Sequence, residues 1–264
     1  MADYEHLRIG RDGAAATVTL ARPYVRNALN TELIEEIRRS MEELTEDDGA
    51  RVIVLTGEGD FFCAGADIGY MRSTADFTYE ENQEDARNLA RMFGAVEECP
   101  KPVLGRIEGA AIGGGLGLVA AADVSVAEEG TVFAFTEVRL GISPATIAPF
   151  VLRKIGYSQS RALFLTGERF DAETAREIGL VHEVAAEENL DAAVQKKVEG
   201  LLAGGPQALA TTKALLRELR GAEPGEETME ITARRTAELR VGEEGQEGLG
   251  AFLEKREPAW KVGT

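Results

Sequence analysis

The chain of 264 residues is poor in the side chains that hold metals and form disulfides. It has two cysteines, Cys63 and Cys99, and two histidines, His6 and His182. A metal centre built from histidine and cysteine needs several such ligands close together, so we expect none. Two cysteines also fall short of the disulfide framework of a small secreted domain, and nothing points to an oxidising compartment.

Basic residues are scarce relative to acids. Lys and Arg number 29 against 46 Asp and Glu, which gives a net charge of −17. Proteins that bind nucleic acid or anionic membranes are more often basic, so we expect neither role. No apolar run is long enough to cross a bilayer, and the first ten residues lack the charged and apolar regions of a secretory signal. We therefore expect a cytoplasmic protein.

What the chain does contain is an alternation of strand-like and helix-like segments. Residues 7–9 and 14–20 predict two strands joined by an Asp-Gly turn, and the β-branched run 51–57 predicts a buried parallel strand. Apolar residues recur at helical spacing over 33–44 and 79–98. Strands that alternate with helices are typical of βαβ units, so the sequence predicts an α/β fold.

The second part of the chain has a different character. From Asn189 onward the pattern is almost entirely helical, with a break at Gly204-Gly205-Pro206. We predict an α/β core over residues 1–200 and a helical region over residues 201–264.

The stretch from Ile107 to Asp123, IEGAAIGGGLGLVAAAD, predicts a strand, a tight glycine turn and a helix whose first turn has no side chains. Such a helix start offers free backbone N–H groups and the positive end of the helix dipole. Glycine also lets a ligand touch the backbone. The stretch is suited to binding an anion, or an oxygen that becomes anionic during a reaction.

Two further patches follow strand-like segments. Residues 61–68 read FFCAGADI, and residues 135–144 read FTEVRLGISP. Loops at the carboxyl ends of parallel strands form the site in α/β folds, so the three patches can converge. Two backbone N–H groups aimed at one oxygen would form an oxyanion hole, and Glu137 would move a proton at carbon.

Other interpretations of these residues stay open at this point. Glycines at a strand-to-helix turn often serve tight packing alone. The stretch 115–120 also fits the loose fingerprint G-x-G-x-x-A with Glu137 about 20 residues further on, which favours a nicotinamide-dependent oxidoreductase. Cys63 is a candidate nucleophile, but no histidine lies near it in the sequence. His182 sits between apolar residues and is expected to be structural.

In this order and at these spacings, the three patches resemble the crotonase family, the enoyl-CoA hydratase/isomerase superfamily. The resemblance covers nearly the whole chain, from ARPYVRNALN at 21–30 to EGLGAFLEKREPAW at 247–260. It implies a ββα spiral core with a C-terminal helical trimerisation region, and a homotrimer or dimer of trimers. It also implies an acyl-CoA thioester substrate, whose carbonyl lies between the N–H groups of Ala66 and Gly114.

The resemblance further implies which residues hold the CoA part of the substrate. No metal or redox cofactor is needed, because CoA belongs to the substrate itself. The final helix often completes the site of a neighbouring subunit. By position the substrate-binding residues are Arg26, Ala28, Ala64, Ala66, Asp67, Ile68, Gly114, Phe252 and Lys255.

One departure from the family pattern affects the predicted reaction. Typical hydratases of the family use two glutamates, and here the position of the first is Gly117 while the second is Glu137. The segment 137–156 looks like that of bacterial hydratases of branched enoyl-CoAs, of the methylglutaconyl-CoA type, in which a glycine can occupy the same position. We therefore predict an enoyl-CoA hydratase in which Glu137 is the acid/base, with a second acid from the helix that contains Glu84 and Asp85 as a further hypothesis.

A single carboxylate leaves two alternatives open. One is a Δ3,Δ2-enoyl-CoA isomerase that uses the same glutamate to move a proton between two carbons. The other is an acyl-CoA-binding protein without catalytic activity.

Overall fold

A six-stranded sheet with the strand order β1-β2-β3-β4-β6-β9 forms the centre of the protein in the computed structural model, which describes residues 4–261. The first pair is antiparallel, and every later pair is parallel. The parallel strands place their carboxyl ends at one edge of the sheet. The strands are β1 (Leu7–Asp12), β2 (Ala15–Leu20), β3 (Val52–Gly57), β4 (Val103–Ile107), β6 (Val124–Glu128) and β9 (Glu183–Ala185).

A second, three-stranded sheet has the order β5-β7-β8 and contains β5 (Ala110–Ile112), β7 (Val132–Ala134) and β8 (Arg169–Asp171). Its first pair is parallel, and its second pair is antiparallel. The chain passes from β4 directly into β5, so this turn carries it from the first sheet to the second. The predicted α/β class is therefore confirmed.

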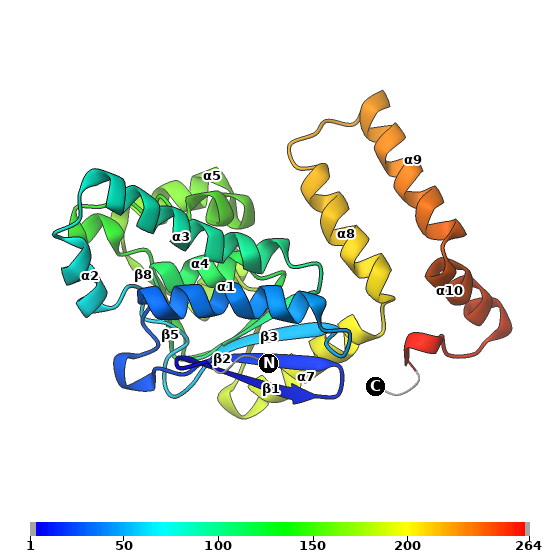
Figure 1. The fold of residues 1–264 in the computed structure, drawn as a ribbon, viewed down its shortest axis with the longest axis horizontal. Coiled ribbons are helices and arrows are strands. Elements are labelled where there is room, and N and C mark those ends of the chain that lie inside the picture. Colours follow the sequence, from blue (N-terminus) through cyan, green and yellow to red (C-terminus); the bar gives the residue numbers. More distant parts are fainter. Residues whose placement is uncertain (1–3, 262–264) are drawn as a thin grey trace.

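Helices cover both faces of the large sheet (Figure 1). On one face α1 contacts α3, α3 contacts α4 and α4 contacts α5, and their apolar side chains form the main core. On the other face α7 packs on β3, β4, β6 and β9 around a smaller core. The helices of the body are α1 (Thr31–Glu46), α2 (Ile68–Thr74), α3 (Tyr79–Glu98), α4 (Gly114–Ala121), α5 (Ala148–Thr166), α6 (Ala172–Glu177) and α7 (Leu190–Leu202), with short 3₁₀ turns η1 (Pro23–Val25), η2 (Glu137–Leu140) and η3 (Glu187–Asn189).

Two predicted helices begin at side-chain caps. The Asn30 side chain accepts from the N–H of Leu33 at the start of α1. At the start of α3, Thr78 and Glu81 form a reciprocal capping box, which satisfies two backbone donors. The helix predicted over residues 79–98 is confirmed at both ends. The sequence did not predict α2, which is a short helix capped by Asp67.

The C-terminal part consists of α8 (Pro206–Glu218), α9 (Glu226–Val241), α10 (Glu243–Glu254) and the turn η4 (Ala259–Lys261). These helices contact one another and extend away from the body (Figure 1). Arg51 ties their two ends to the sheet, because it donates to the Trp260 carbonyl at 2.7 Å and to the Gly204 carbonyl at 2.7 Å. The predicted helical character of this region is confirmed, whereas the division into two domains stays a prediction.

Candidate active site

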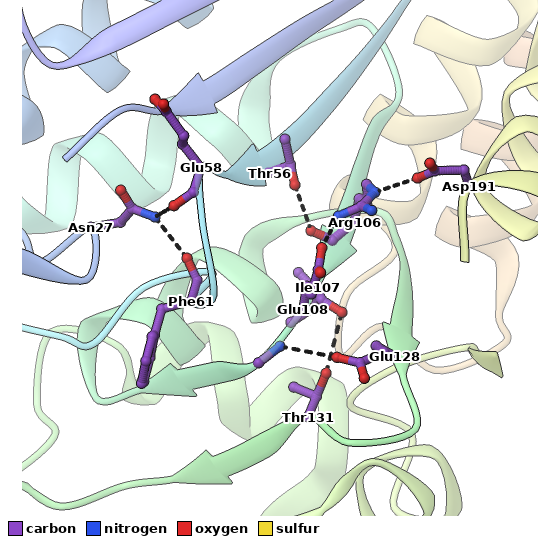
Figure 2. A network of polar contacts seen from close by, with 11 residues as sticks. Asn27, Thr56, Glu58, Phe61, Arg106, Ile107, Glu108, Glu128, Thr131 and Asp191 are labelled. Carbon is purple, nitrogen blue, oxygen red and sulfur yellow. Dashed lines mark hydrogen bonds and ion pairs between the residues drawn. The ribbon is translucent and has the colours of Figure 1, made fainter. Parts of the chain in front are cut away.

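The loop after β3 is held in place by one buried asparagine. Asn27 has a left-handed backbone (φ 54°), and its amide donates to the carbonyls of Glu58 at 2.9 Å and Phe61 at 2.7 Å (Figure 2). Its side-chain oxygen accepts from the N–H of Arg22 at 2.9 Å. These bonds fix the start of the segment that runs on to Ala66.

That segment lies alongside β5 as a parallel strand. The N–H of Cys63 donates to the Ala110 carbonyl at 3.1 Å, and the Cys63 carbonyl accepts from Ile112 at 2.9 Å. Cys63 is therefore paired with Ala111 in parallel register. Three residues further along both segments stand Ala66 and Gly114. The pairing thus brings two residues that are distant in the sequence to the same level.

Both of these residues present an unused backbone donor. Among residues 4–261, neither the N–H of Ala66 nor that of Gly114 donates a hydrogen bond. Gly114 is also the first residue of α4, where the helix dipole adds positive potential. A Cβ on Gly115 would lie 2.5 Å from the Cys63 carbonyl oxygen, so the two segments can approach this closely because Gly115 has no side chain.

The turn from β4 to β5 is fixed by close packing and polar contacts. A Cβ on Gly109 (φ 69°) would lie 1.8 Å from the Asp60 carbonyl oxygen, so only glycine fits there. The Glu128 carboxylate accepts from the Gly109 N–H at 3.4 Å, and Thr131 donates to the Ile107 carbonyl at 3.3 Å (Figure 2). On the sheet side, Figure 2 also shows Thr56, Arg106, Glu108 and Asp191 in one connected set of contacts.

Glu137 reaches the same place from β7. The strands β5 and β7 are parallel with Ile112 opposite Ala134, and the Gly113 N–H donates to the Ala134 carbonyl at 3.0 Å. Glu137 follows at the start of η2, and its Oε1 would lie 3.1 Å from a Cβ on Gly113. The carboxylate therefore lies beside the turn that presents the Gly114 N–H. The three predicted catalytic residues come from three parallel segments and meet at one end of them.

The surroundings of Glu137 favour its protonated form. Its Oε2 is enclosed and makes no hydrogen bond within the described part of the chain. Burial raises the pKa of Glu137, and its own backbone N–H opposes this rise with a smaller effect. No charged side chain contributes to the shift. A carboxyl group of raised pKa is suited to accept and return a proton during a reaction.

The position of the first family glutamate is closed by apolar side chains. A Cβ on Gly117 would lie 2.5 Å from a methyl group of Ile147 and 2.6 Å from the ring of Phe93. Both side chains are fully buried. No space is left there for an acid, so the departure at Gly117 is built into the packing of α4.

The two acids of α3 suggested as a second acid are engaged in other contacts, and a role for either in the reaction stays a prediction. Glu84 pairs at the surface with Arg87 at 3.0 Å and with Arg91 at 2.7 Å. The Asp85 carboxylate accepts from the Tyr70 hydroxyl.

Most of the predicted CoA-binding residues lie on two adjacent segments. The Ala64 N–H donates to the Arg26 carbonyl at 3.0 Å, and the Leu29 N–H donates to the Gly65 carbonyl at 2.7 Å. The exposed Arg26 guanidinium lies 4.9 Å from the centre of the Phe61 ring. Ala28, on the same segment, is buried, and its carbonyl accepts from Arg22.

Asp67 and Ile68 follow directly after Ala66. The Asp67 carboxylate pairs with Arg22 at 3.1 Å and accepts from the N–H of Gly69 at 2.7 Å, so it is engaged in capping α2. The Ile68 side chain is 66% exposed, which leaves it free to contact a ligand. The role of both residues in CoA binding stays a prediction.

A single chain does not bring the last two predicted residues to the site. Phe252 and Lys255 are exposed at the end of α10, and Figure 1 shows α10 at the opposite end of the molecule from α2. Their predicted contact with CoA would therefore require the α10 of another copy of the chain.

Two alternative interpretations from the sequence lose their basis in the structure. Cys63 is fully buried, and burial raises the pKa of its thiol to about 12, so it is not an activated nucleophile. Gly115 and Gly117 lie inside α4 and are covered by other residues. A pyrophosphate could not reach them, which argues against the dinucleotide fingerprint.

Within residues 4–261, no three side chains among His, Cys, Asp and Glu come together as metal ligands would. In the same part of the chain, no helix combines the length and apolarity needed to span a membrane.

Sequence reasoning missed Asn27 and Arg22, which position the loops of the site. An asparagine that follows a proline-initiated turn is a signal for left-handed backbone, because Asn adopts it more readily than most residues. The contacts of Asn27 with residues 58–61 span about 30 positions and leave no local trace in the sequence.

Comparison with known proteins agrees with this geometry. The model of the family described as enoyl-CoA hydratase/isomerase matches residues 10–263. A putative enoyl-CoA hydratase of Thermus thermophilus is 33% identical over 249 residues, which cover 93% of this chain and 97% of that protein. A peroxisomal Delta(3,5)-Delta(2,4)-dienoyl-CoA isomerase of Arabidopsis thaliana is 29% identical over 266 residues, which cover 96% of this chain and 95% of the isomerase.

Solved structures give the same result. The crystal structure of an enoyl-CoA hydratase from Shewanella pealeana superposes with a TM-score of 0.94 at 38% identity, over 97% of this chain and 96% of that chain. The predicted spiral crotonase fold with a C-terminal helical region and the predicted class of hydratase-like enzyme are confirmed. Because the family model matches almost from end to end and the fold agrees, this chain belongs to the enoyl-CoA hydratase/isomerase family, the crotonase family.

Proposed function

We propose that the protein is an enoyl-CoA hydratase that adds water across the α,β double bond of an enoyl-CoA thioester. One observation carries the proposal. Two unused N–H groups, on Ala66 and Gly114, lie at the same level of paired segments, beside the buried, unpaired carboxyl group of Glu137. Paired donors stabilise a developing oxyanion, and a carboxyl group of raised pKa suits proton transfer.

The geometry supports a reaction with one acid/base group. The thioester oxygen accepts from Ala66 and Gly114, which lowers the energy of the enolate. In its carboxylate form, Glu137 takes a proton from water while the water oxygen bonds to the β-carbon. The same carboxyl group then gives that proton to the α-carbon, which closes the enolate and restores the starting form of Glu137.

The substrate brings its own CoA, so we propose no metal or redox cofactor. The adenine and pantetheine would lie along Arg26, Ala28 and the segment 64–68. Phe252 and Lys255 would come from a neighbouring copy, in a homotrimer or a dimer of trimers. Several apolar side chains left exposed in one chain support this assembly: Leu216, Met229, Val241, Leu249, Phe252 and Leu253. The cytoplasmic location stays a prediction.

A second candidate is a Δ3,Δ2-enoyl-CoA isomerase with the same residues. The apolar packing of Phe93 and Ile147 against Gly117 favours it, because a second acid near this position would help to activate water. A third candidate, an acyl-CoA-binding protein without turnover, shares the oxyanion donors.

The deciding experiment follows the absorbance of the enoyl-thioester band and then the product mass. The substrates are crotonyl-CoA, a branched and carboxylated enoyl-CoA, and a 3-enoyl-CoA. A gain of one water supports the hydratase and identifies its substrate group. Migration of the double bond without a change of mass in ordinary water supports the isomerase, and binding without turnover supports the third candidate.

A further inference from the structure

A cavity of about 610 Å³ lies at the end of α4 that is remote from Gly114. We call it the α4 C-terminal cavity. Ligand sites for small molecules have volumes of roughly 300–1,000 Å³, so its size suits a metabolite. The proposed reaction uses none of its residues. The polar side chains that line it are Glu97, Asp123, Arg153, Lys154, His182 and Arg220.

Two guanidinium groups share one carboxylate in this cavity. Glu97 Oε1 pairs with an Nη atom of Arg153 and, at 3.0 Å, with an Nη atom of Arg220. No other hydrogen bond of either guanidinium occurs within the described residues, so most of their donors are unused. Arg153 also lies over the ring of Phe150 at 5.0 Å, which holds it against the wall. One positive charge is left uncompensated at Glu97.

Lys154 supplies a second excess charge. Its ammonium group donates to the carbonyls of Ala122 and, at 3.4 Å, of Val119, which leaves one of its three donors unused. The neighbouring acid, Asp123, pairs with Lys213 at 2.6 Å instead. Burial lowers the pKa of Lys154 to about 8, although the negative charges of Asp123 and Glu97 oppose this. Among the described residues, no carboxylate lies within ion-pair distance of this ammonium group.

His182 adds a neutral donor. Its Nδ1 accepts from the Ser125 N–H at 3.0 Å, so the neutral ring carries its proton on Nε2. Burial and the nearby Lys154 and Lys197 lower its pKa to about 4, which keeps the ring neutral. The cavity therefore combines donors of three chemical kinds, in a chain whose net charge is −17.

We propose that the α4 C-terminal cavity binds a dianionic phosphate-type group, either as a free ion or as the phosphoryl group of a small metabolite. Arg153 and Arg220 can each offer paired N–H groups to its oxygens, and Lys154 and His182 can bond to the remaining ones. An anion would also supply the counter-charge that Lys154 lacks. The proposal is independent of the reaction at Glu137.

Calorimetric titration with sulfate at pH 8 tests the site, because sulfate does not titrate near this pH. Excess CoA is present to occupy any phosphate-binding groups of the substrate site, and ionic strength is held constant. We expect saturable binding with net proton uptake, measured in two buffers of different ionisation enthalpy, because the anion raises the pKa of Lys154. If ribose 5-phosphate binds more tightly than sulfate, the ligand of the cavity is a phosphomonoester. If the two bind equally, the ligand is the free ion.

Single variants locate the binding. Lys154→Met and Arg153→Gln should each weaken sulfate binding by about tenfold or more, as expected for the loss of a charge-assisted hydrogen bond. If either of these two substitutions prevents folding, Arg220→Gln is tested in its place. The control Arg8→Gln removes a cation whose side chain is 70% exposed on β1 and should bind as the wild type does. The proposal is wrong if sulfate does not bind saturably, or if binding survives these cavity substitutions.

Discussion

The ring of Phe93 occupies the space that any side chain at residue 117 would need, 2.6 Å from the position of a Cβ on Gly117. Phe93 comes from α3 and Gly117 from α4, and both are fully buried. The missing acid of the hydratase pattern is thus replaced by a packed apolar contact. Restoring the acid alone would not restore its function, because the neighbouring α3 fills the place where it would lie.

The contact predicts an unusual effect for a glycine-to-alanine change in a helix. Gly117→Ala should lower the free energy of unfolding by about 1–3 kcal/mol through overpacking. Gly200→Ala in α7, where nothing lies within 4 Å of the added Cβ, should instead raise it by roughly 0.5–1 kcal/mol. Urea unfolding measures both. Gly117→Glu should be still less stable, and a gain of hydratase activity in that variant would contradict the packing argument.

Glu137→Gln should reduce kcat by about 10²–10⁴-fold, because the carboxyl group beside the oxyanion donors can then no longer transfer a proton. The dissociation constant of a CoA ester should change little, since the amide has nearly the same shape. The control Glu84→Gln alters a surface acid of α3 and should keep the wild-type rate. Activity that survives in Glu137→Gln would show that another group carries the proton.

The same variant should be more stable than the wild type at neutral pH. Burial raises the pKa of Glu137 above its ordinary value of 4.5, so the folded state disfavours the charged carboxylate. The stability that this group contributes is present below pH 4.5 and is lost as pH rises through its folded pKa. Glutamine does not ionise, so the variant does not lose stability in this way as pH rises. Urea unfolding should therefore give Glu137→Gln a higher free energy of unfolding than the wild type at pH 7 and the same value near pH 4. The same difference at both pH values would contradict this explanation.

Phe252→Asp should prevent assembly and impair activity. The Phe252 side chain is 80% exposed in one chain and would be covered in the proposed trimer. Light scattering coupled to gel filtration should show a smaller species, with a raised KM for enoyl-CoA if α10 completes a neighbouring site. Gln246→Asp introduces the same charge on a polar, exposed position of α10 and should leave the assembly intact. A trimer that persists with Phe252→Asp would exclude this surface from the interface.

The two cysteines should resist alkylation in the native protein. Cys63 and Cys99 are free and buried, and the Cys63 thiol has a pKa of about 12 because of its burial. Iodoacetamide at pH 8 should therefore label neither residue until urea unfolds the chain. Mass spectrometry after digestion reads out each site separately, and rapid labelling of native Cys63 would reopen its interpretation as a nucleophile.

Much of the site could be predicted because its signals are local. The glycine run at 113–115 indicates a helix start without side chains, and α4 begins within it, at Gly114. The segments that contain Ala66 and Glu137 each follow a strand, so their meeting at one sheet edge follows from the α/β pattern. The resemblance then assigned the donors and the acid to positions that the structure does bring together.

The rest could not be predicted because it depends on contacts between distant segments. Nothing near Gly117 in the sequence indicates that Phe93 fills its surroundings. The short helix α2 depends on the cap that Asp67 provides, and Asp67 is itself oriented by Arg22. The extended position of α8–α10 depends on Arg51, whose partners lie about 150 and 210 residues away.

Cys63 is paired with Ala111. The positions of the two oxyanion donors therefore depend on how many residues separate each donor from this pair, more than on the identity of most side chains. Insertion or deletion of a single residue between 63 and 66, or between 111 and 114, would shift one N–H past the other by a full residue and turn it away from the shared oxygen. Loops remote from these windows, and from the step between Ala134 and Glu137, do not set the relative positions of these groups. The protein should therefore tolerate changes of loop length in most connections and lose turnover when either three-residue step is altered.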